Sequence, residues 1–481
     1  MATLIASCNQ GDKAENTETV AVIDDHTQSN ADSIQVKHLD LDIKVDFEQH
    51  RIIGRASWDI NNKYGLDRLI LDAYRLTVDS VYVDDKKVQY TWGPALIHLG
   101  NALKIPVNKD SKHIDIFYKS DPSARALQWL EPQQTSGKQF PFLYTQSESI
   151  YARSWIPCPD GPGIRFTYSA RVQVPQGLLA LMSADNPQQK NDSGIYHFNM
   201  NIPIPAYLMA LGVGDLQFKA IDKRRGVYAD STVIDAANNE FSEVGDMVRT
   251  AEELYGPYRW GRYDILVLPS GFPLGGMENP KLTFCTPTII SGDKSLVNLI
   301  AHELAHNWSG NLVTNATWND FWLNEGFTVY FERRLTEKMT DKSYADMLWE
   351  LGYQDLQHTV EEMEADSNMQ DSHLKLDLKG RDPDEGLTDI AYEKGALFLK
   401  LIENNVGRER MDAFLKGYFD SHAFKTITTE DFIDYLNTNL IKGDKELADK
   451  INIDAWVYGP GIPDNAPRAD MERFNKVDEE R

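Results

Sequence analysis

Hydrophobic and polar positions alternate along the first half of the chain. Between residues 39 and 47, leucine, isoleucine, valine and phenylalanine alternate with aspartate and lysine. A period of two is typical of a half-buried β-strand. Similar short runs recur, separated by Gly, Asn, Asp and Pro, at residues 69–71, 78–83, 114–117 and 166–174. The pattern predicts an all-β domain over residues 34–220.

Beyond about residue 221 the period changes to that of amphipathic helices. Residues 241–255 carry apolar side chains three and four positions apart, and residues 263–268 form a short apolar run that predicts a strand. Further helices are predicted at residues 344–363, 395–404, 411–419 and 429–440. The chain is therefore predicted to be a multidomain α+β protein, with a mainly helical domain over residues 221–467 after the β domain.

Both ends of the chain lack these patterns. Residues 1–33 are polar and predict a disordered tether, and residues 468–481 are rich in charge and predict a linker stub. Leu4-Ile5-Ala6-Ser7-Cys8 resembles a bacterial lipobox, in which the cysteine carries a lipid. One interpretation is a lipid anchor at Cys8 and a place in the bacterial cell envelope, as a lipoprotein or in the periplasm. The other is a chance match in a cytoplasmic protein.

Composition narrows the classes of partner. A chain of 481 residues exceeds one hydrophobic core, so two or three domains are expected. The net charge of −24 argues against nucleic acid, because phosphate binding requires basic patches. No apolar run reaches the roughly 18 residues of a transmembrane span. The three cysteines show no C-x-x-C spacing and cannot form a disulfide framework.

The candidate chemistry begins with His302-Glu303-Leu304-Ala305-His306, in a segment with an apolar face at helical spacing. Histidines four apart on a helix project from one face, so both imidazoles reach one metal ion. Glu325, in a second apolar segment, supplies a third ligand. Three protein ligands leave one tetrahedral position open, as in a catalytic zinc site, and Glu303 is placed to take a proton from water. The alternative is two core helices with satisfied histidines.

Four motifs in order give the chain a resemblance to a known family. They are Gly275–Asn279, His302–His306, Trp322–Gly326 and Tyr392–Gly395. From about residue 34 to residue 468, the chain resembles the gluzincin aminopeptidases of peptidase family M1, most closely the branch of leukotriene A4 hydrolase and aminopeptidase B. The resemblance implies a thermolysin-like catalytic domain and a zinc-dependent hydrolase that removes N-terminal residues from short peptides with a free N-terminus.

The resemblance also assigns the catalytic roles. It implies one zinc ion per chain, held by His302, His306 and Glu325, with Glu303 as the general base. Tyr392 matches the tyrosine that stabilises the tetrahedral intermediate, where a protonated phenol donates to the developing oxyanion. The residues alone leave open that Tyr392 is a core tyrosine on a helix.

Substrate binding is implied for seven further residues. The resemblance implies that the Gly275-Gly276-Met277-Glu278 stretch confers exopeptidase specificity: Glu278 holds the free α-amino group, and Gly275 and Gly276 let the backbone approach an extended substrate. Gln146 and Glu148 match the segment where the β domain touches the site, and Glu148 is implied as a second carboxylate for the amine. Asp384 matches a position near the pocket for the first side chain and suggests affinity for Arg or Lys. From the residues alone, these segments also fit a Gly-rich turn with an exposed Glu278, a surface Glu148, and a turn or helix cap at Asp384.

Two departures from the branch leave other functions open. Leu387 stands where leukotriene A4 hydrolase has a tyrosine near its lipid channel. The branch also continues into a helical C-terminal domain beyond the point where this sequence ends, which suggests a truncated form. The alternatives to an aminopeptidase are a lipid epoxide hydrolase and an inactive remnant that binds peptides.

Overall fold

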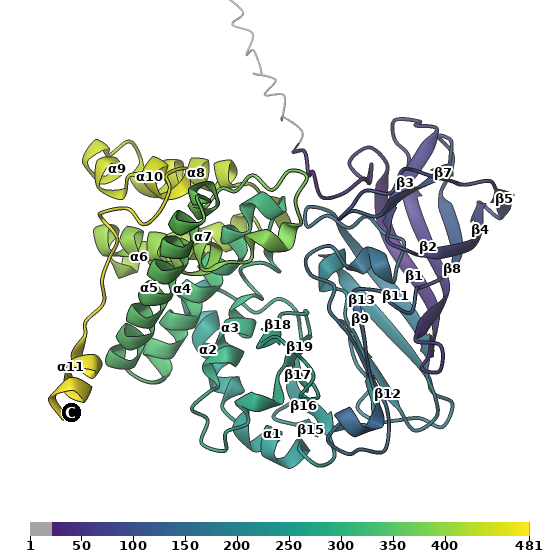
Figure 1. The fold of residues 1–481 in the computed structure, drawn as a ribbon, viewed down its shortest axis with the longest axis horizontal. Coiled ribbons are helices and arrows are strands. Elements are labelled where there is room, and N and C mark those ends of the chain that lie inside the picture. The colour runs from purple at the N-terminus through teal and green to yellow at the C-terminus, as the bar shows by residue number, and fades with distance from the viewer. Residues whose placement is uncertain (1–21, 481) are drawn as a thin grey trace, which may run out of the picture.

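The computed structural model describes residues 22–480, so Cys8 and the lipobox-like segment lie outside the described residues. A β-rich N-terminal half lies beside a mainly helical C-terminal half (Figure 1). This order of domains is the one that the hydrophobic pattern predicts. Within residues 22–480, no helix is both long enough and apolar enough to cross a bilayer.

The largest sheet of the β domain has seven strands in the order β13-β11-β1-β2-β8-β4-β5. Strand β1 pairs in parallel with β11 and antiparallel with β2, and its alternate side chains from Leu39 to Val45 are buried. The predicted period of two is thus confirmed. The strands are β1 (Gln35–Asp46), β2 (Arg51–Asn61), β4 (Thr77–Val83), β5 (Lys86–Val88), β8 (His113–Lys119), β11 (Arg165–Gln173) and β13 (Ile195–Pro205).

Two smaller sheets complete this domain, with strand orders β12-β14-β10-β9 and β3-β7-β6. Every residue of β10 is buried, and the chain leaves its last residue, Thr145, directly into Gln146 and Glu148. This sheet therefore carries the β-domain segment that is predicted to reach the site. The strands are β3 (Arg68–Ala73), β6 (Thr91–Trp92), β7 (Asn101–Pro106), β9 (Leu127–Leu130), β10 (Phe142–Thr145), β12 (Leu179–Met182) and β14 (Leu211–Gly214).

A five-stranded sheet opens the catalytic half, in the order β15-β16-β17-β19-β18. Strands β16, β17 and β19 are parallel, and β18 pairs antiparallel at the edge. Because β15 pairs with β16, this sheet begins at Leu216 and not at the predicted boundary of residue 221. The strands are β15 (Leu216–Ala220), β16 (Arg225–Asp230), β17 (Tyr263–Val267), β18 (Gly276–Met277) and β19 (Leu282–Cys285).

Helix α4 is buried along most of its length and contacts α2, α3, α5 and α6. A π-helical turn at Ile390–Lys394 leads into α6, and a two-stranded sheet joins β20 (Val313–Asn315) to β21 (Lys425–Ile427). The helices are α1 (Ile234–Glu240), α2 (Val244–Tyr255), α3 (Asn298–Ala305), α4 (Trp322–Met339), α5 (Lys342–Ala365), α6 (Gly395–Val406), α7 (Arg408–Ser421), α8 (Thr429–Leu436), α9 (Lys445–Ile451), α10 (Ile453–Val457) and α11 (Glu472–Glu480).

Two glycines set the distance between α4 and α6. A Cβ added at Gly326 would lie 2.7 Å from the Cα of Gly395, and one added at Gly395 would lie 2.9 Å from the Cα of Gly326. Since any larger residue at either position would force the backbones apart, this contact requires glycine. It places Glu325 of α4 beside the π-helical turn that carries Tyr392.

The prediction of a disordered tether is wrong for residues 22–33. His26 is almost fully buried, its backbone carbonyl accepts from Arg153 Nη2 at 2.7 Å, and its Nε2 lies 3.1 Å from the carbonyl of Leu378. Asp25 pairs with Lys379 at 3.2 Å. The polar groups of His26 bind buried partners in both halves of the molecule, whereas a composition rule interprets such groups as solvated. We call residues 22–33 the N-terminal strap.

The linker predicted at residues 468–481 is also wrong within the described chain. Helix α11 packs against α5, where Arg473 donates to Ser343 Oγ at 2.9 Å and to Asp341 Oδ2 at 3.0 Å. Arg468 pairs with the buried Glu350. The charges of this segment therefore form ion pairs with one helix, although the mixture of charges resembles that of a linker.

Replacing Arg153 tests how strongly the strap region is held. Arg153 is buried and bonds Asp160 at 2.9 Å, so Arg153→Ala leaves a buried carboxylate unpaired. We expect the free energy of unfolding to fall by about 3–5 kcal/mol. The matched control is Arg171→Ala, which breaks an exposed 2.8 Å pair with Asp42 and is expected to cost less than about 1 kcal/mol. Equal losses in denaturant titrations of the two variants would show that the buried pair stabilises the protein no more than the exposed one.

Candidate active site

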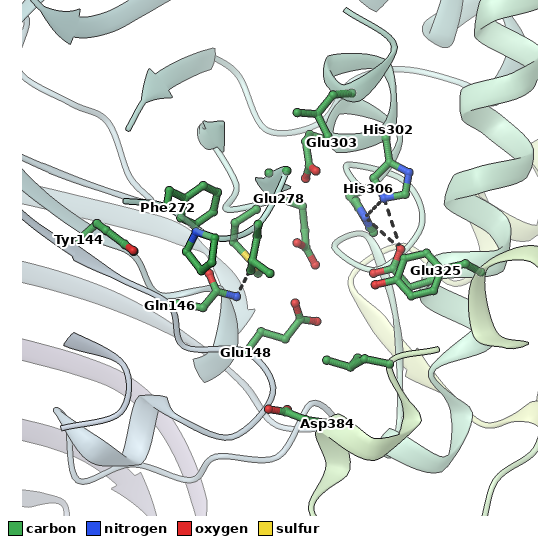
Figure 2. A pocket seen from close by; sticks show the side chains of 18 of the residues that line it. Tyr144, Gln146, Glu148, Phe272, Glu278, His302, Glu303, His306, Glu325 and Asp384 are labelled. Carbon is green, nitrogen blue, oxygen red and sulfur yellow. Dashed lines mark hydrogen bonds and ion pairs between the residues drawn. The ribbon is translucent and has the colours of Figure 1, made fainter. Parts of the chain in front are cut away.

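Three predicted metal ligands converge at the junction of α3 and α4 (Figure 2). His302 lies on α3, His306 ends that helix, and Glu325 lies in the first turn of α4. The two Nε2 atoms are 3.3 Å apart, and Glu325 Oε2 lies 3.4 Å from His302 Nε2 and 3.5 Å from His306 Nε2. Both imidazoles thus project from one face of the helix, as their spacing predicts.

This triangle fits a zinc ion. Zinc bonds of about 2.0–2.2 Å separate tetrahedral ligands by about 3.3–3.6 Å, which matches the three observed distances. Glu325 Oε2 is also buried without a hydrogen-bond partner among the residues described. A buried carboxylate oxygen without a partner is costly, and a cation removes that cost. Two imidazoles and one carboxylate are a donor set that zinc prefers.

Partners behind the ligands fix their orientation. Glu332 Oε2 lies 3.1 Å from His302 Nδ1, and Asn298 donates to Glu332 Oε1 at 3.4 Å. Thr328 Oγ1 lies 3.2 Å from His306 Nδ1. Because the far nitrogen of each imidazole is engaged, both Nε2 atoms face the same point. Burial lowers the pKa of His306 to about 4, so that its ring is neutral and its lone pair is free for a metal.

Glu303 projects from α3 toward the edge strand β18. Its side chain is 4% exposed, and a Cβ added at Gly276 would overlap the Glu303 carboxylate. The glycine therefore leaves room for the carboxylate. Burial, together with Glu278 and Glu325 nearby, raises the pKa of Glu303 well above its usual range. A carboxylate with a raised pKa is a stronger base than one in water.

Two further carboxylates meet from different domains. Glu278 follows β18 in the catalytic half, and Glu148 follows β10 in the β domain. Burial raises the pKa of Glu278 to about 7, and burial with the neighbouring Glu278 raises the pKa of Glu148. One oxygen of each has no hydrogen-bond partner among the described residues. Glu278 is 3% exposed, so the alternative of a turn with an exposed glutamate is wrong.

The other predicted binding residues lie around this pair. Gln146 Nε2 lies 3.2 Å from Met277 Sδ, which joins the β domain to β18. Gly275 packs against α3, where a Cβ would lie 3.0 Å from Leu299 Cδ1. Tyr392 is half-buried with its ring centroid 6.4 Å from that of His302, and burial and Glu325 raise the pKa of its phenol.

Asp384 enters the site from a loop of the catalytic half. Asp382 supplies the cap of the short Pro383–Gly386 turn, by accepting from the backbone of Asp384. Asp384 itself accepts from Ser149 Oγ at 2.8 Å and from the Tyr151 hydroxyl. Its side chain therefore faces the β domain, and the capping role predicted as an alternative belongs to Asp382.

All twelve residues singled out in the sequence line one cavity of 780 Å³ between the two halves. Two protein-family models match the chain: the peptidase M1 N-terminal domain matches residues 35–208, and the peptidase family M1 domain matches residues 241–456. Leukotriene A-4 hydrolase of Xenopus laevis is 38% identical over 459 residues, covering 93% of this chain and 75% of the relative. The chain belongs to peptidase family M1.

Two further relatives agree with this assignment. Leucine aminopeptidase 2 of Yarrowia lipolytica is 38% identical, covering 93% of this chain and 70% of the relative. The solved structure of native yeast LTA4 hydrolase superposes with a TM-score of 0.90 at 35% identity, over 95% of this chain and 73% of that one. The predicted family, order of domains and zinc chemistry are confirmed, and this M1 enzyme is a zinc metallopeptidase.

Several residues of the M1 site escape prediction from the sequence. Glu332 lies two helical turns after Glu325, so the helical period could have predicted that Glu332 shares a face of the helix with this ligand. Asn298 precedes His302 by one turn in the same way. Arg125 lies on a β-domain loop far from any motif, and Tyr151 lies shortly after Glu148, but no local pattern marks either residue. The remaining lining residues without a predicted role are Gln128, Tyr144, Phe272, Pro273, Leu274, Leu299 and Leu387.

Glu332→Gln tests the support of the zinc ligands. The amide presents a weaker acceptor to His302 Nδ1, so we expect zinc affinity to fall by about 10- to 100-fold. Titration of the zinc-loaded protein with a competing chelator measures this without turnover. Glu337→Gln is the matched control on the same helix, because Glu337 pairs with Arg408 at 2.6 Å and does not line the cavity. Equal affinities in the two variants would contradict the role of Glu332.

Proposed function

We propose that this M1 enzyme removes the N-terminal residue of short peptides. The observation that supports the proposal is the pair of buried carboxylates, Glu278 and Glu148, each with an unpartnered oxygen beside the zinc ligands. A peptide α-amino group has a pKa of about 7.7–8.0 and is cationic over much of the neutral range. It supplies the positive charge and the N–H donors that both carboxylates lack. The name of the leucine aminopeptidase 2 relatives agrees with this proposal.

The position of this pair explains cleavage at the first peptide bond. Glu278 and Glu148 lie next to the zinc triangle in the same cavity (Figure 2). An amine held by them brings the carbonyl of the same N-terminal residue toward His302, His306 and Glu325. A longer N-terminal extension would have to pass the amine anchors, whose unpaired carboxylates disfavour an uncharged chain.

The side chains of this protein then handle the protons. When bound, zinc supplies Lewis acidity, which polarises a carbonyl and lowers the pKa of water to about 7. Glu303 takes a proton from the attacking water and returns it to the leaving amine. Tyr392 keeps its phenol proton, because its pKa is raised, and donates a hydrogen bond to the oxyanion that develops on the carbonyl.

Aminoacyl-coumarin substrates test the proposal directly. We expect release of coumarin from substrates with a free amine, loss of release with a zinc chelator, and its return when zinc is added back. N-acetylated versions of the same substrates should be cleaved far more slowly, since they lack the charge that the carboxylate pair binds. Equal cleavage of free and acetylated substrates would contradict an aminopeptidase, and bound zinc without any cleavage would favour the peptide-binding remnant.

Glu303→Gln separates catalysis from metal binding. The amide cannot accept a proton, so we expect kcat to fall by about 100- to 10,000-fold, while the zinc content stays at one per chain. Metal analysis alongside the coumarin assay measures both quantities. Turnover at the wild-type rate in zinc-loaded Glu303→Gln would exclude Glu303 as the base.

Epoxide hydrolysis on a lipid is the alternative that the leukotriene A-4 hydrolase relatives suggest. Six carboxylates line the cavity, and this charge favours a cationic amine over the carboxylate of a fatty acid. An assay with an epoxy fatty acid tests it. The envelope location and the lipid anchor at Cys8 stay predictions from the sequence.

A further inference from the structure

Among the described residues that line the cavity, Arg125 is the one arginine or lysine. It lies in the turn between β8 and β9, with its guanidinium carbon 4.0 Å from the ring centroid of Tyr151. Its Nη2 donates to the Tyr151 hydroxyl, and its Nη1 lies 3.6 Å from Asp382 Oδ2. The motifs of the sequence and the proposed chemistry assign Arg125 no role.

The Tyr151 hydroxyl connects this arginine to Asp384. It accepts from Arg125 and donates to Asp384 Oδ2, while Ser149 Oγ donates to Asp384 Oδ1 at 2.8 Å. Burial and the hydrogen bond to Asp384 raise the pKa of Tyr151, which keeps its proton in place. Each oxygen of Asp384 thus accepts from a donor of the β domain. One of these donors, the Tyr151 hydroxyl, is itself bonded to the Arg125 guanidinium.

This cluster borders the place of the first side chain. In Figure 2, Asp384 lies beyond Glu148 on the side away from Glu303, while Glu278 and the zinc ligands lie on the other side. This step rests on the proposed function: with the amine at Glu278 and Glu148 and the carbonyl toward the zinc ligands, the side chain of the N-terminal residue is the part of the substrate that reaches Asp384.

We propose that Arg125 is a specificity-determining residue that makes this enzyme discriminate against N-terminal lysine and arginine in favour of uncharged side chains. A cationic side chain that approaches Asp384 meets a carboxylate whose oxygens already have donors and a guanidinium of the same charge. An apolar side chain of equal length meets neither penalty. The resemblance to the family alone implies the opposite preference at Asp384.

Lysine and norleucine form the test pair, because their side chains have similar length and differ in the terminal ammonium. We expect the wild-type enzyme to have a higher kcat/KM for norleucyl-coumarin than for lysyl-coumarin. In Arg125→Gln the ratio of lysyl to norleucyl kcat/KM should rise by roughly tenfold, mainly through KM for the lysyl substrate. Arg125 is 38% exposed, so added salt should weaken the wild-type discrimination.

Three variants connect the effect to this cluster. Tyr151→Phe keeps the ring under Arg125 but frees an oxygen of Asp384, and should also raise the lysyl ratio. In Arg125→Gln, the carboxylate of Asp384 is free to attract the ammonium of the lysyl substrate. Asp384→Asn in that background should therefore remove most of the gain in the lysyl ratio. Arg75→Gln is the matched control, because Arg75 also lies over a tyrosine ring, that of Tyr74 at 5.5 Å, but does not line the cavity.

The turnover measurements have clear outcomes. An unchanged lysyl ratio in Arg125→Gln would overturn the proposal, and so would an equal rise in Arg75→Gln. Equal gains for the lysyl and norleucyl substrates would also overturn it, because they would show a change of volume and not of charge.

Binding of lysine amide and norleucine amide to zinc-loaded Glu303→Gln, measured by calorimetry, gives the same ratio without turnover. The proposal is supported if norleucine amide binds more tightly and Arg125→Gln in that background narrows the difference. If wild-type enzyme cleaves no coumarin substrate but this binding ratio behaves as expected, the proposed function fails and the selectivity stands. If neither amide binds, both fail.

Discussion

Burial of negative charge between two domains is the constraint on which this structure depends. Glu148, Glu278, Glu303, Glu325, Glu332 and Asp384 all line one cavity, against two histidines and one arginine. In a buried site neighbouring carboxylates raise one another's pKa, and burial together with Glu278 and Glu325 raises the pKa of both Glu148 and Glu303. The excess of carboxylates in this cavity favours the binding of cations, and a divalent metal ion and the substrate amine supply that positive charge.

Each half of the molecule contributes what the other lacks. The catalytic half holds the zinc ligands on α3 and α4, where helical spacing and the Gly326–Gly395 contact fix their positions. The β domain adds Gln146, Glu148 and the hydroxyl donors to Asp384. Chemistry therefore resides mostly in one domain, while the binding of the substrate end is shared. An M1 site of this kind needs both domains in a fixed register.

The sequence predicts those parts of the site that depend on short-range geometry. His302, Glu303 and His306 follow from the period of one helix, and the order of an all-β and a helical domain follows from the change of hydrophobic period. Arg125 and Tyr151 escape prediction because they meet Asp384 only through the packing of loops about 230 to 260 positions away in the chain. The N-terminal strap resembles a tether because composition cannot distinguish polar groups bound to buried partners from polar groups bound to water.

The N-terminal strap also bears on how the cavity behaves as a whole. Arg153 of the β domain binds the carbonyl of His26, and the ring of His26 reaches the carbonyl of Leu378 in the loop that leads to Asp384. The two walls of the cavity are thus tied by a third piece of chain outside the site itself. We expect a cleft whose two walls are linked in this way to keep a constant width. Peptide ends would then be selected by their fit to a preformed cleft, and little binding energy would be needed for domain closure.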